Sequence, residues 1–233
     1  MPNTAHLYQS IQRYPFTYGL AGFFCLCYLI QTLLPEMLLV YGLDLSTFSI
    51  STSYRLFTYI LVHQNIVHLG MNVVALLAFG RVIEEQIGPR MFAGMTVLGT
   101  IIPSGTLMLL LSAMSLEPGL IVGASGITFT LIGMTGVLAP VTHFSSPATT
   151  GLTVYLTDRS VLRIVDITGV WVIAAVVPQI IRLIQHVSVP VLGHLSGFVL
   201  GIVLGLFLMT EYPEQSVRTL VANHEDWFRG AAV

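Results

Sequence analysis

A serine and a histidine, far apart in the chain, each lie among glycines at the start of a long apolar run. The serine is Ser125 in the sequence Gly-Ala-Ser-Gly at 123–126, and the histidine is His194 in Gly-His-Leu-Ser-Gly at 193–197. A histidine that takes the proton of a serine hydroxyl creates a nucleophile for acyl groups. We therefore predict that Ser125 and His194 meet inside a membrane and cut peptide bonds. The alternative for the first stretch is that its small residues only let two helices pack closely.

The composition indicates a membrane protein. Hydrophobic residues make up 55% of the 233 residues and charged residues only 9%, whereas soluble domains average about 25% charged residues. The net charge of −2 argues against a nucleic-acid partner, because such partners attract basic surfaces. Cys25 and Cys27 lie two residues apart in the first apolar run, so they point to different faces of one helix and predict no disulfide. The lipid bilayer is the expected surrounding of this chain.

The sequence contains six apolar runs that approach the length of about 20 residues needed to cross a bilayer. They cover residues 16–34, 64–84, 92–114, 120–140, 162–181 and 189–209. The fifth helix is expected to begin near Leu162 and to kink or end at Pro178. Residues 35–63 mix aromatic, charged and apolar side chains, which predicts a loop of short helices at the membrane interface.

The predicted fold class is all-α, a polytopic membrane protein of six helices. Its parts are a cytoplasmic segment at 1–15, the membrane domain at 16–210 and a cytoplasmic tail at 211–233. The six spans place seven arginines on the side of both termini and two on the other side. Because cytoplasmic loops are rich in arginine, both termini are expected in the cytoplasm. Ser125 and His194 then lie at a similar depth below the outer surface.

His68 and Asn72 are four residues apart, so they share one face of the second helix. Both side chains can donate hydrogen bonds. Near the outer surface they would bind the oxyanion over Ser125, together with the backbone N–H of Ser125. The alternative is that they hydrogen-bond between helices as structural polar groups.

No acidic residue is placed to complete a triad. Glu84 and Asp166 lie on the cytoplasmic side, and nothing places Glu117 behind His194. We therefore predict a Ser–His dyad whose histidine is oriented by packing or by a neutral partner. His63 lies in the loop above His68, where a structural role and a catalytic role are equally compatible with the sequence. The histidines lack metal-ligand spacing and an acid at their depth, so neither a metal nor a cofactor is expected.

These motifs together resemble the rhomboid family of intramembrane serine proteases, over roughly residues 16–210. Residues 123–126 look like its Gly-x-Ser-Gly nucleophile motif, and residues 68–72 look like its His-x-x-x-Asn motif. Residues 80–84 are similar to its Gly-x-x-x-Glu, and His194 is followed by Gly197 and Gly201, as in its histidine helix.

The resemblance implies a six-helix core in which Ser125 is the nucleophile and His194 the general base and acid. It also implies oxyanion binding by His68, Asn72 and the Ser125 amide, a structural role for Glu84, and a substrate gate at the fifth helix.

The residues expected near the site are Phe129, Gly123, Gly126, Glu84, Arg55, Gly197 and Gly201. Three positions depart from the family pattern: Tyr54 precedes Arg55 where tryptophan is frequent, Gly193 replaces an alanine, and Phe129 replaces a tyrosine that stacks on the histidine. None of these departures removes a catalytic group.

The expected partners are membrane-protein substrates, and the oligomeric state is left open. The host membrane is either a bacterial inner membrane or a membrane of the eukaryotic secretory pathway, since compact fungal Golgi rhomboids have a similar form. The alternatives to a protease are a non-proteolytic member of the family that binds and sorts membrane clients, and a small transporter.

Overall fold

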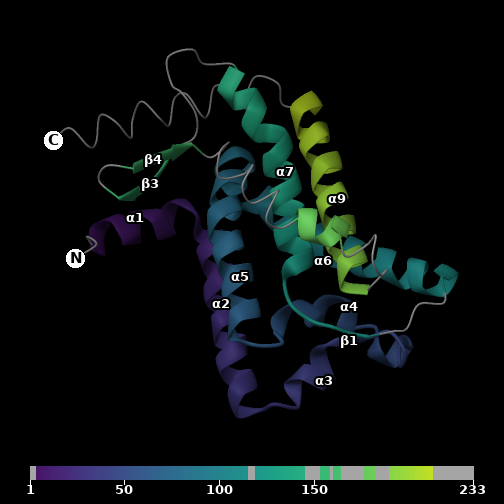
Figure 1. Cartoon of the computed structure of the whole chain (residues 1–233). Coiled ribbons are helices and arrows are strands. Elements are labelled where there is room, and N and C mark those ends of the chain that lie inside the picture. The colour runs from purple at the N-terminus through teal and green to yellow at the C-terminus, as the bar shows by residue number, and fades with distance from the viewer. Residues whose placement is uncertain are drawn as a thin grey trace.

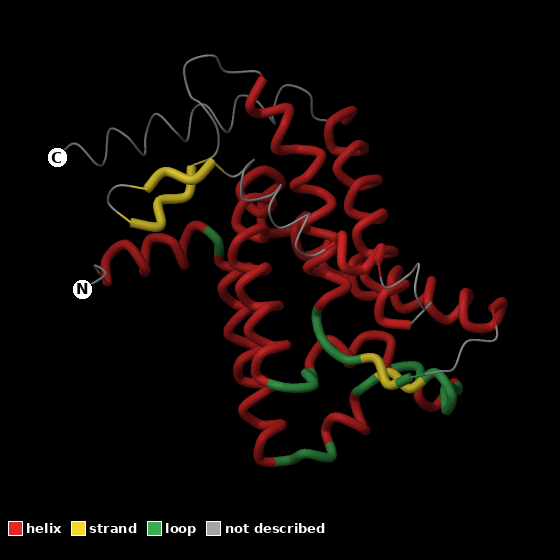
Figure 2. Tube along the Cα trace, in the orientation of Figure 1, coloured by secondary structure: helices red, strands yellow, loops and turns green. Residues whose placement is uncertain are grey.

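The computed structural model describes residues 4–114, 119–144, 153–157, 160–163, 176–181 and 189–211, and these residues are mainly helical (Figure 2). The long helices are α2 (Pro15–Leu33), α5 (Ile66–Ala75), α6 (Arg81–Met114), α7 (Ser125–Phe144) and α9 (Val189–Glu211). α2 and α5 stand beside each other, and α7 and α9 form a second neighbouring pair (Figure 1). α1 (Thr4–Arg13) runs across the direction of α2 where α2 begins.

Three helical stretches within the described residues are long and apolar enough to cross a membrane. They are Pro15–Leu33, Ile66–Leu110 and Val191–Thr210. The second has 45 residues, which at about 1.5 Å per residue exceeds twice the thickness of a hydrocarbon core of about 30 Å. Gly88, with φ 75° and ψ 162°, interrupts it, so this stretch consists of two helices joined at a kink. Six crossings of the membrane stay a prediction.

The first turn of α2 is capped by a carboxylate from a distant part of the chain. Glu84 accepts hydrogen bonds from the backbone N–H of Phe16 at 2.9 Å and of Thr17 at 2.8 Å. Amides in the first turn of a helix have no acceptor within the helix, so an external one stabilises them. Glu84 is only 2% exposed, and these contacts agree with the structural role that the resemblance implies.

Replacing Glu84 by glutamine is expected to lower the free energy of unfolding by about 2–3 kcal/mol, because one buried N–H would then face an NH2 group. Glu85→Gln is the matched control. Glu85 pairs with Arg13 at 2.5 Å where the two side chains are 15% and 38% exposed, and such pairs contribute about 1 kcal/mol or less. Thermal unfolding in detergent measures both variants, and equal losses would contradict this account of α2.

α7 and α9 pack with their backbones in contact. A Cβ added to Gly201 would overlap the carbonyl oxygen of Thr130, and one added to Gly197 would lie 2.7 Å from that of Gly126. Gly133 fits against Gly201 in turn, since its added Cβ would be 3.1 Å from the Gly201 Cα. Glycines of α9 therefore meet the turns of α7 that contain Gly126 and Gly133.

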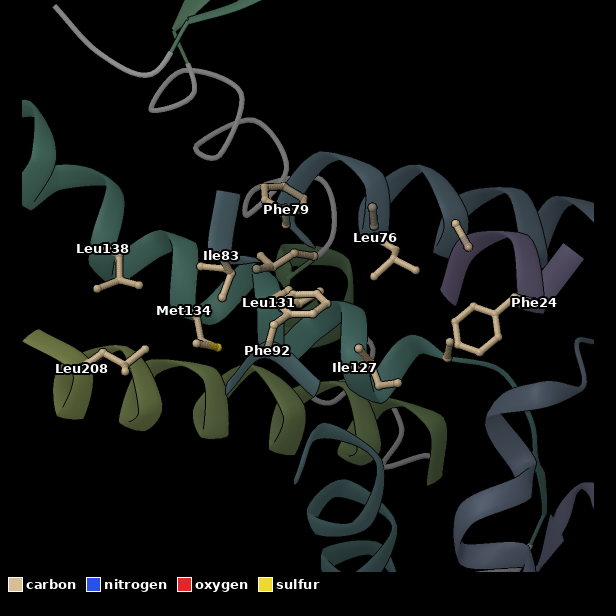
Figure 3. Close-up of a cluster of buried hydrophobic side chains, with 14 of the residues drawn as sticks. Phe24, Leu76, Phe79, Ile83, Phe92, Ile127, Leu131, Met134, Leu138 and Leu208 are labelled. Carbon is tan, nitrogen blue, oxygen red and sulfur yellow. The ribbon is translucent and has the colours of Figure 1, made fainter. Parts of the chain in front are cut away.

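An apolar core surrounds α7 and joins it to the other long helices (Figure 3). It includes Phe24 of α2, Ile83 and Phe92 of α6, Leu131 of α7 and Leu208 of α9, all at most 2% exposed. This packing fixes the position and rotation of α7. Ser125, the first residue of α7, is thereby held at the start of a rigid element.

The predicted fourth helix is wrong at its beginning. Residues Leu120–Ile121, expected to be helical, form β2, which pairs antiparallel with β1 (Leu43–Asp44) in the loop at 35–63. The pairing draws this segment into an extended conformation, and the helix begins only at Ser125. The start of α7 is therefore connected directly to the loop.

The predicted fifth helix is also wrong at its beginning. Leu162 and Arg163 lie in β4 (Ser160–Arg163), which forms an antiparallel hairpin with β3 (Thr153–Thr157). Threonine, valine and tyrosine are frequent in these strands and favour extended structure. Residues 176–181, which include Pro178, are helical, and the remainder of this predicted helix lies outside the described residues. The tail beyond residue 211 lies outside them as well.

The loop at 35–63 contains the short helices that the sequence predicted. They are α3 (Met37–Tyr41), η1 (Ile50–Thr52), α4 (Arg55–Thr58) and η2 (Tyr59–Leu61). Arg55 donates from Nε to the carbonyl oxygen of Val40 at 3.1 Å, and the Tyr54 hydroxyl donates to the same oxygen at 3.1 Å. Arg55 thus connects two parts of the loop.

Candidate active site

The segment before Ser125 adopts a conformation that glycine favours. Gly123 has φ 99°, in the region that side chains with a Cβ rarely occupy. A Cβ at Gly123 would also lie 2.8 Å from Nε2 of His68. The backbone N–H of Gly123 donates to the Tyr59 carbonyl oxygen at 2.9 Å. The glycine therefore lets the His68 ring approach the turn that precedes the serine.

His194 lies on α9 opposite the first turn of α7. Its ring stacks on the ring of Phe129 with a centroid distance of 4.5 Å and an interplanar angle of 1°. Phe129 is one turn after Ser125, and Gly197, one turn after His194, meets Gly126. The turns that carry Ser125 and His194 are thereby brought against each other. Phe129 thus stacks on the histidine at the position where the family pattern has a tyrosine.

Asn72 is buried at 4% exposure beside the same segment. Its Nδ2 donates to the His68 carbonyl oxygen at 3.0 Å, and its Oδ1 accepts from the Thr128 hydroxyl at 3.3 Å. Nδ2 would lie 3.5 Å from a Cβ on Gly123. His68 and Asn72 therefore both face the turn before Ser125, as their shared helix face predicted.

α5 is fixed at its start by its own cap. The Asn65 side chain accepts from the backbone N–H of His68 at 2.9 Å, a typical N-cap contact. The five residues Leu76–Gly80 that follow α5 are π-helical. The cap fixes where α5 begins, and so fixes the position of His68 and Asn72 relative to the turn before Ser125.

Three residues next to the site were missed by the sequence prediction or left without a role. Tyr59 binds Gly123 as described, and its hydroxyl donates to the Thr100 carbonyl oxygen at 2.8 Å. Thr128 binds Asn72. His63 is fully buried, and its Nε2 accepts from the Ala124 N–H at 3.4 Å. The one available signal for His63 was Gln31, a polar residue in an apolar helix, because such residues usually have a specific partner.

The remaining predicted residues lie away from the serine or support the helices. Glu84 caps α2 and Arg55 connects parts of the loop, while Gly126, Gly197 and Gly201 let α7 and α9 approach. Among the described residues, no three His, Cys, Asp or Glu side chains are grouped so that they could hold a metal ion.

The fold and the site define a class of helical membrane protein in which a serine and a histidine lie near the N-terminal ends of two closely packed helices. A family model described as the Rhomboid domain matches residues 51–211, well over half of the chain. This protein belongs to the rhomboid family. A comparison with curated proteins found no match.

Proposed function

We propose that this protein is an intramembrane serine endopeptidase that cleaves transmembrane or membrane-proximal segments of other proteins. The observation that supports it most strongly is the register of α7 against α9. Phe129 lies one turn after Ser125 on α7, and its ring stacks on the His194 ring with centroids 4.5 Å apart. The Ser125 hydroxyl and the His194 imidazole therefore belong to facing turns of the two helices. Membership of the rhomboid family supports the same reaction.

In the proposed reaction, His194 takes the proton of the Ser125 hydroxyl as its oxygen attacks the scissile carbonyl. The stacked Phe129 ring holds the imidazole plane by packing, so no acidic residue is needed to orient it. His194 then gives the proton to the leaving amine, and a water molecule hydrolyses the acyl-enzyme with His194 as base.

The negative oxygen formed during the attack needs donors that are already in place. The Ser125 N–H lies at the start of α7, where helix amides are electropositive. We assign the other two donors to His68 and Asn72, which face the same turn. One Asn72 N–H already binds the His68 carbonyl, so the second N–H of that amide is the one assigned to the oxyanion.

His68→Ala and Asn72→Ala are each expected to lower kcat by about 10²- to 10³-fold with little change in KM, because the donors act mainly in the transition state. Thr128→Val is the matched control, since it removes the hydrogen bond to Asn72 and preserves the shape of a buried side chain. Steady-state cleavage of a model substrate measures all three. A loss of kcat in Thr128→Val as large as in Asn72→Ala would contradict the donor role of Asn72.

The proposal includes six membrane crossings with both termini in the cytoplasm and the site near the outer surface. A substrate helix must unwind to expose its peptide bond, because helical carbonyls and amides are engaged with each other. Small or helix-breaking residues at the cleavage site are therefore expected to favour cleavage.

A non-proteolytic family member that binds and sorts membrane clients is the second candidate. Purified protein in liposomes with a panel of model transmembrane substrates separates the two. The protease predicts a cut near the outer end of the substrate helix, abolished by His194→Ala. Capture of substrates without a cut, by both proteins and across the panel, would favour the sorting function.

A further inference from the structure

His63 is a fully buried histidine (0% exposed) that the proposed reaction does not use. It precedes α5, and α2 holds it in place. The Gln31 side chain donates to the His63 carbonyl oxygen at 2.7 Å and accepts from the His63 N–H at 3.0 Å. The Phe24 ring meets the imidazole edge-on, with centroids 5.9 Å apart.

The imidazole reaches the segment that carries the nucleophile. Nε2 accepts from the Ala124 N–H at 3.4 Å, and the ring lies edge-to-face with His68 at 5.4 Å. An acceptor Nε2 requires a neutral ring with its proton on Nδ1. Burial, followed by the neighbouring His68, lowers the pKa of His63 to about 4, so the ring is neutral at pH 7.

The buried Nδ1 of His63 has no hydrogen-bond partner among the described residues. A buried unpaired donor costs free energy, so an apolar residue would be more favourable here if the position served packing alone. A histidine at position 63 is explained if its Nε2 is needed to accept the hydrogen bond from the Ala124 N–H.

The backbone N–H groups of Gly123, Ala124 and Ser125 follow one another where the chain enters α7. The N–H of Gly123 binds the Tyr59 carbonyl and that of Ala124 binds His63. We propose that His63 is a positioning residue that holds the Ala124 N–H and so aims the Ser125 N–H at the oxyanion. This inference rests on the proposed function.

His63→Phe and His63→Gln test this role, because phenylalanine fills the site without an acceptor and glutamine restores one. We expect His63→Phe to lower kcat by about 10- to 100-fold at nearly constant KM, with most of the loss recovered in His63→Gln. A kcat for His63→Phe within twofold of the wild type, or a His63→Gln no better than His63→Phe, would overturn the role.

Hydrogen–deuterium exchange of peptides that cover 122–125 tests the same contact without activity. We expect faster exchange in His63→Phe than in the wild type and His63→Gln, and equal exchange would overturn the contact. A wild type that cleaves no substrate but shows this pattern would contradict the proposed function and leave the contact of His63 in place.

The lowered pKa of His63 also predicts a pH dependence of stability. Among the groups described in contact with His63, the other titratable side chain is His68. As the pH falls from 6.5 to about 4, the unfolded chain takes up a proton that folded His63 does not bind, so stability is lost across this window. The fall in the unfolding temperature is expected to be smaller in His63→Phe, and an identical fall would contradict the neutral, buried state.

A second inference concerns α1, which exposes two apolar side chains near its C-terminal end. Tyr8 is 63% and Ile11 42% exposed, and the two share a helix face. Arg13, on the other side of the helix, reaches Glu85 with Nε 2.9 Å from Oε2. Most of the side chains described in α1 are exposed, but exposed apolar side chains on one face of an amphipathic helix favour an apolar surrounding for that face.

The neighbouring helix α2 also exposes apolar side chains. Phe16, Phe23 and Leu26 are 36%, 48% and 53% exposed along α2, the face expected to contact lipid. α1 runs across the start of α2 (Figure 1). Glu84 binds the first turn of α2, and the adjacent Glu85 binds Arg13 of α1. We infer that α1 lies in the headgroup layer of the bilayer, with Tyr8 and Ile11 in contact with lipid.

Nitroxide labels at positions 8, 11 and 9 test this placement in a Cys25→Ser/Cys27→Ala protein reconstituted in liposomes. Labels at 8 and 11 are expected to collide with oxygen more than with a water-soluble nickel chelate, and the matched label at Gln9 is expected to show the reverse. Equal nickel access at all three positions would overturn the inference. Low access to both reagents at 8 and 11 would also overturn it, since a protein would then cover this face.

Discussion

Replacing Ser125 by alanine is expected to lower kcat for a transmembrane substrate by on the order of 10⁴-fold or more, because the alanine has no nucleophile. The thermal unfolding midpoint is expected to stay unchanged. Ser125 is half-buried at the first residue of α7, and the smaller alanine adds no atom that could disturb the packing of α7 against α9. Cleavage assays and unfolding in detergent measure both quantities on the same preparation.

Ser196→Ala is the matched control for this prediction. Ser196 lies on α9 two residues after His194, and its hydroxyl donates to the Gly193 carbonyl oxygen at 2.9 Å. It has no role in the proposed reaction, so its activity is expected to stay close to that of the wild type. Cleavage by Ser125→Ala at the rate of Ser196→Ala would show that another residue is the nucleophile.

Gly201→Ala is expected to lower the free energy of unfolding by more than about 3 kcal/mol, because the added methyl group would overlap the Thr130 carbonyl oxygen and neither backbone can move without separating two helices. Cleavage is expected to fall with stability. The contact between α7 and α9 places His194 against the turn of Ser125, so a wider spacing separates the two groups.

Gly136→Ala is the control, because Gly136 is a glycine of α7 with no atom within 4 Å of an added Cβ. The same substitution is expected to be neutral there or to stabilise the protein by up to about 1 kcal/mol through helix propensity. Opposite signs of the two effects in thermal unfolding would support the close packing of α7 and α9. Equal effects would contradict it.

The helices were predictable where one local signal dominates. α9 (Val189–Glu211) covers the whole run predicted at 189–209, because a long and mainly apolar run defines it. The approach of the last helix to Gly126 and Gly133 was also predictable, since glycines every fourth residue form one narrow face. These local patterns were sufficient to bring Ser125 and His194 to the same interface.

The strands and the role of His63 were not predictable, because they depend on partners far away in the chain. β2 pairs with residues of the loop at 35–63, and an apolar pair such as Leu120–Ile121 favours a helix equally well. His63 binds Ala124 across 61 positions of the sequence. No spacing rule connects a loop residue with such a distant amide.

The most direct measurement of the central claim is labelling by a serine-directed fluorophosphonate, with the modified residue identified by mass spectrometry. The Ser–His dyad predicts that the label is found on Ser125 in the folded protein and is lost in His194→Ala, whose unfolding temperature stays close to that of the wild type. A label on a different serine, or equal labelling of Ser125 without His194, would contradict the dyad.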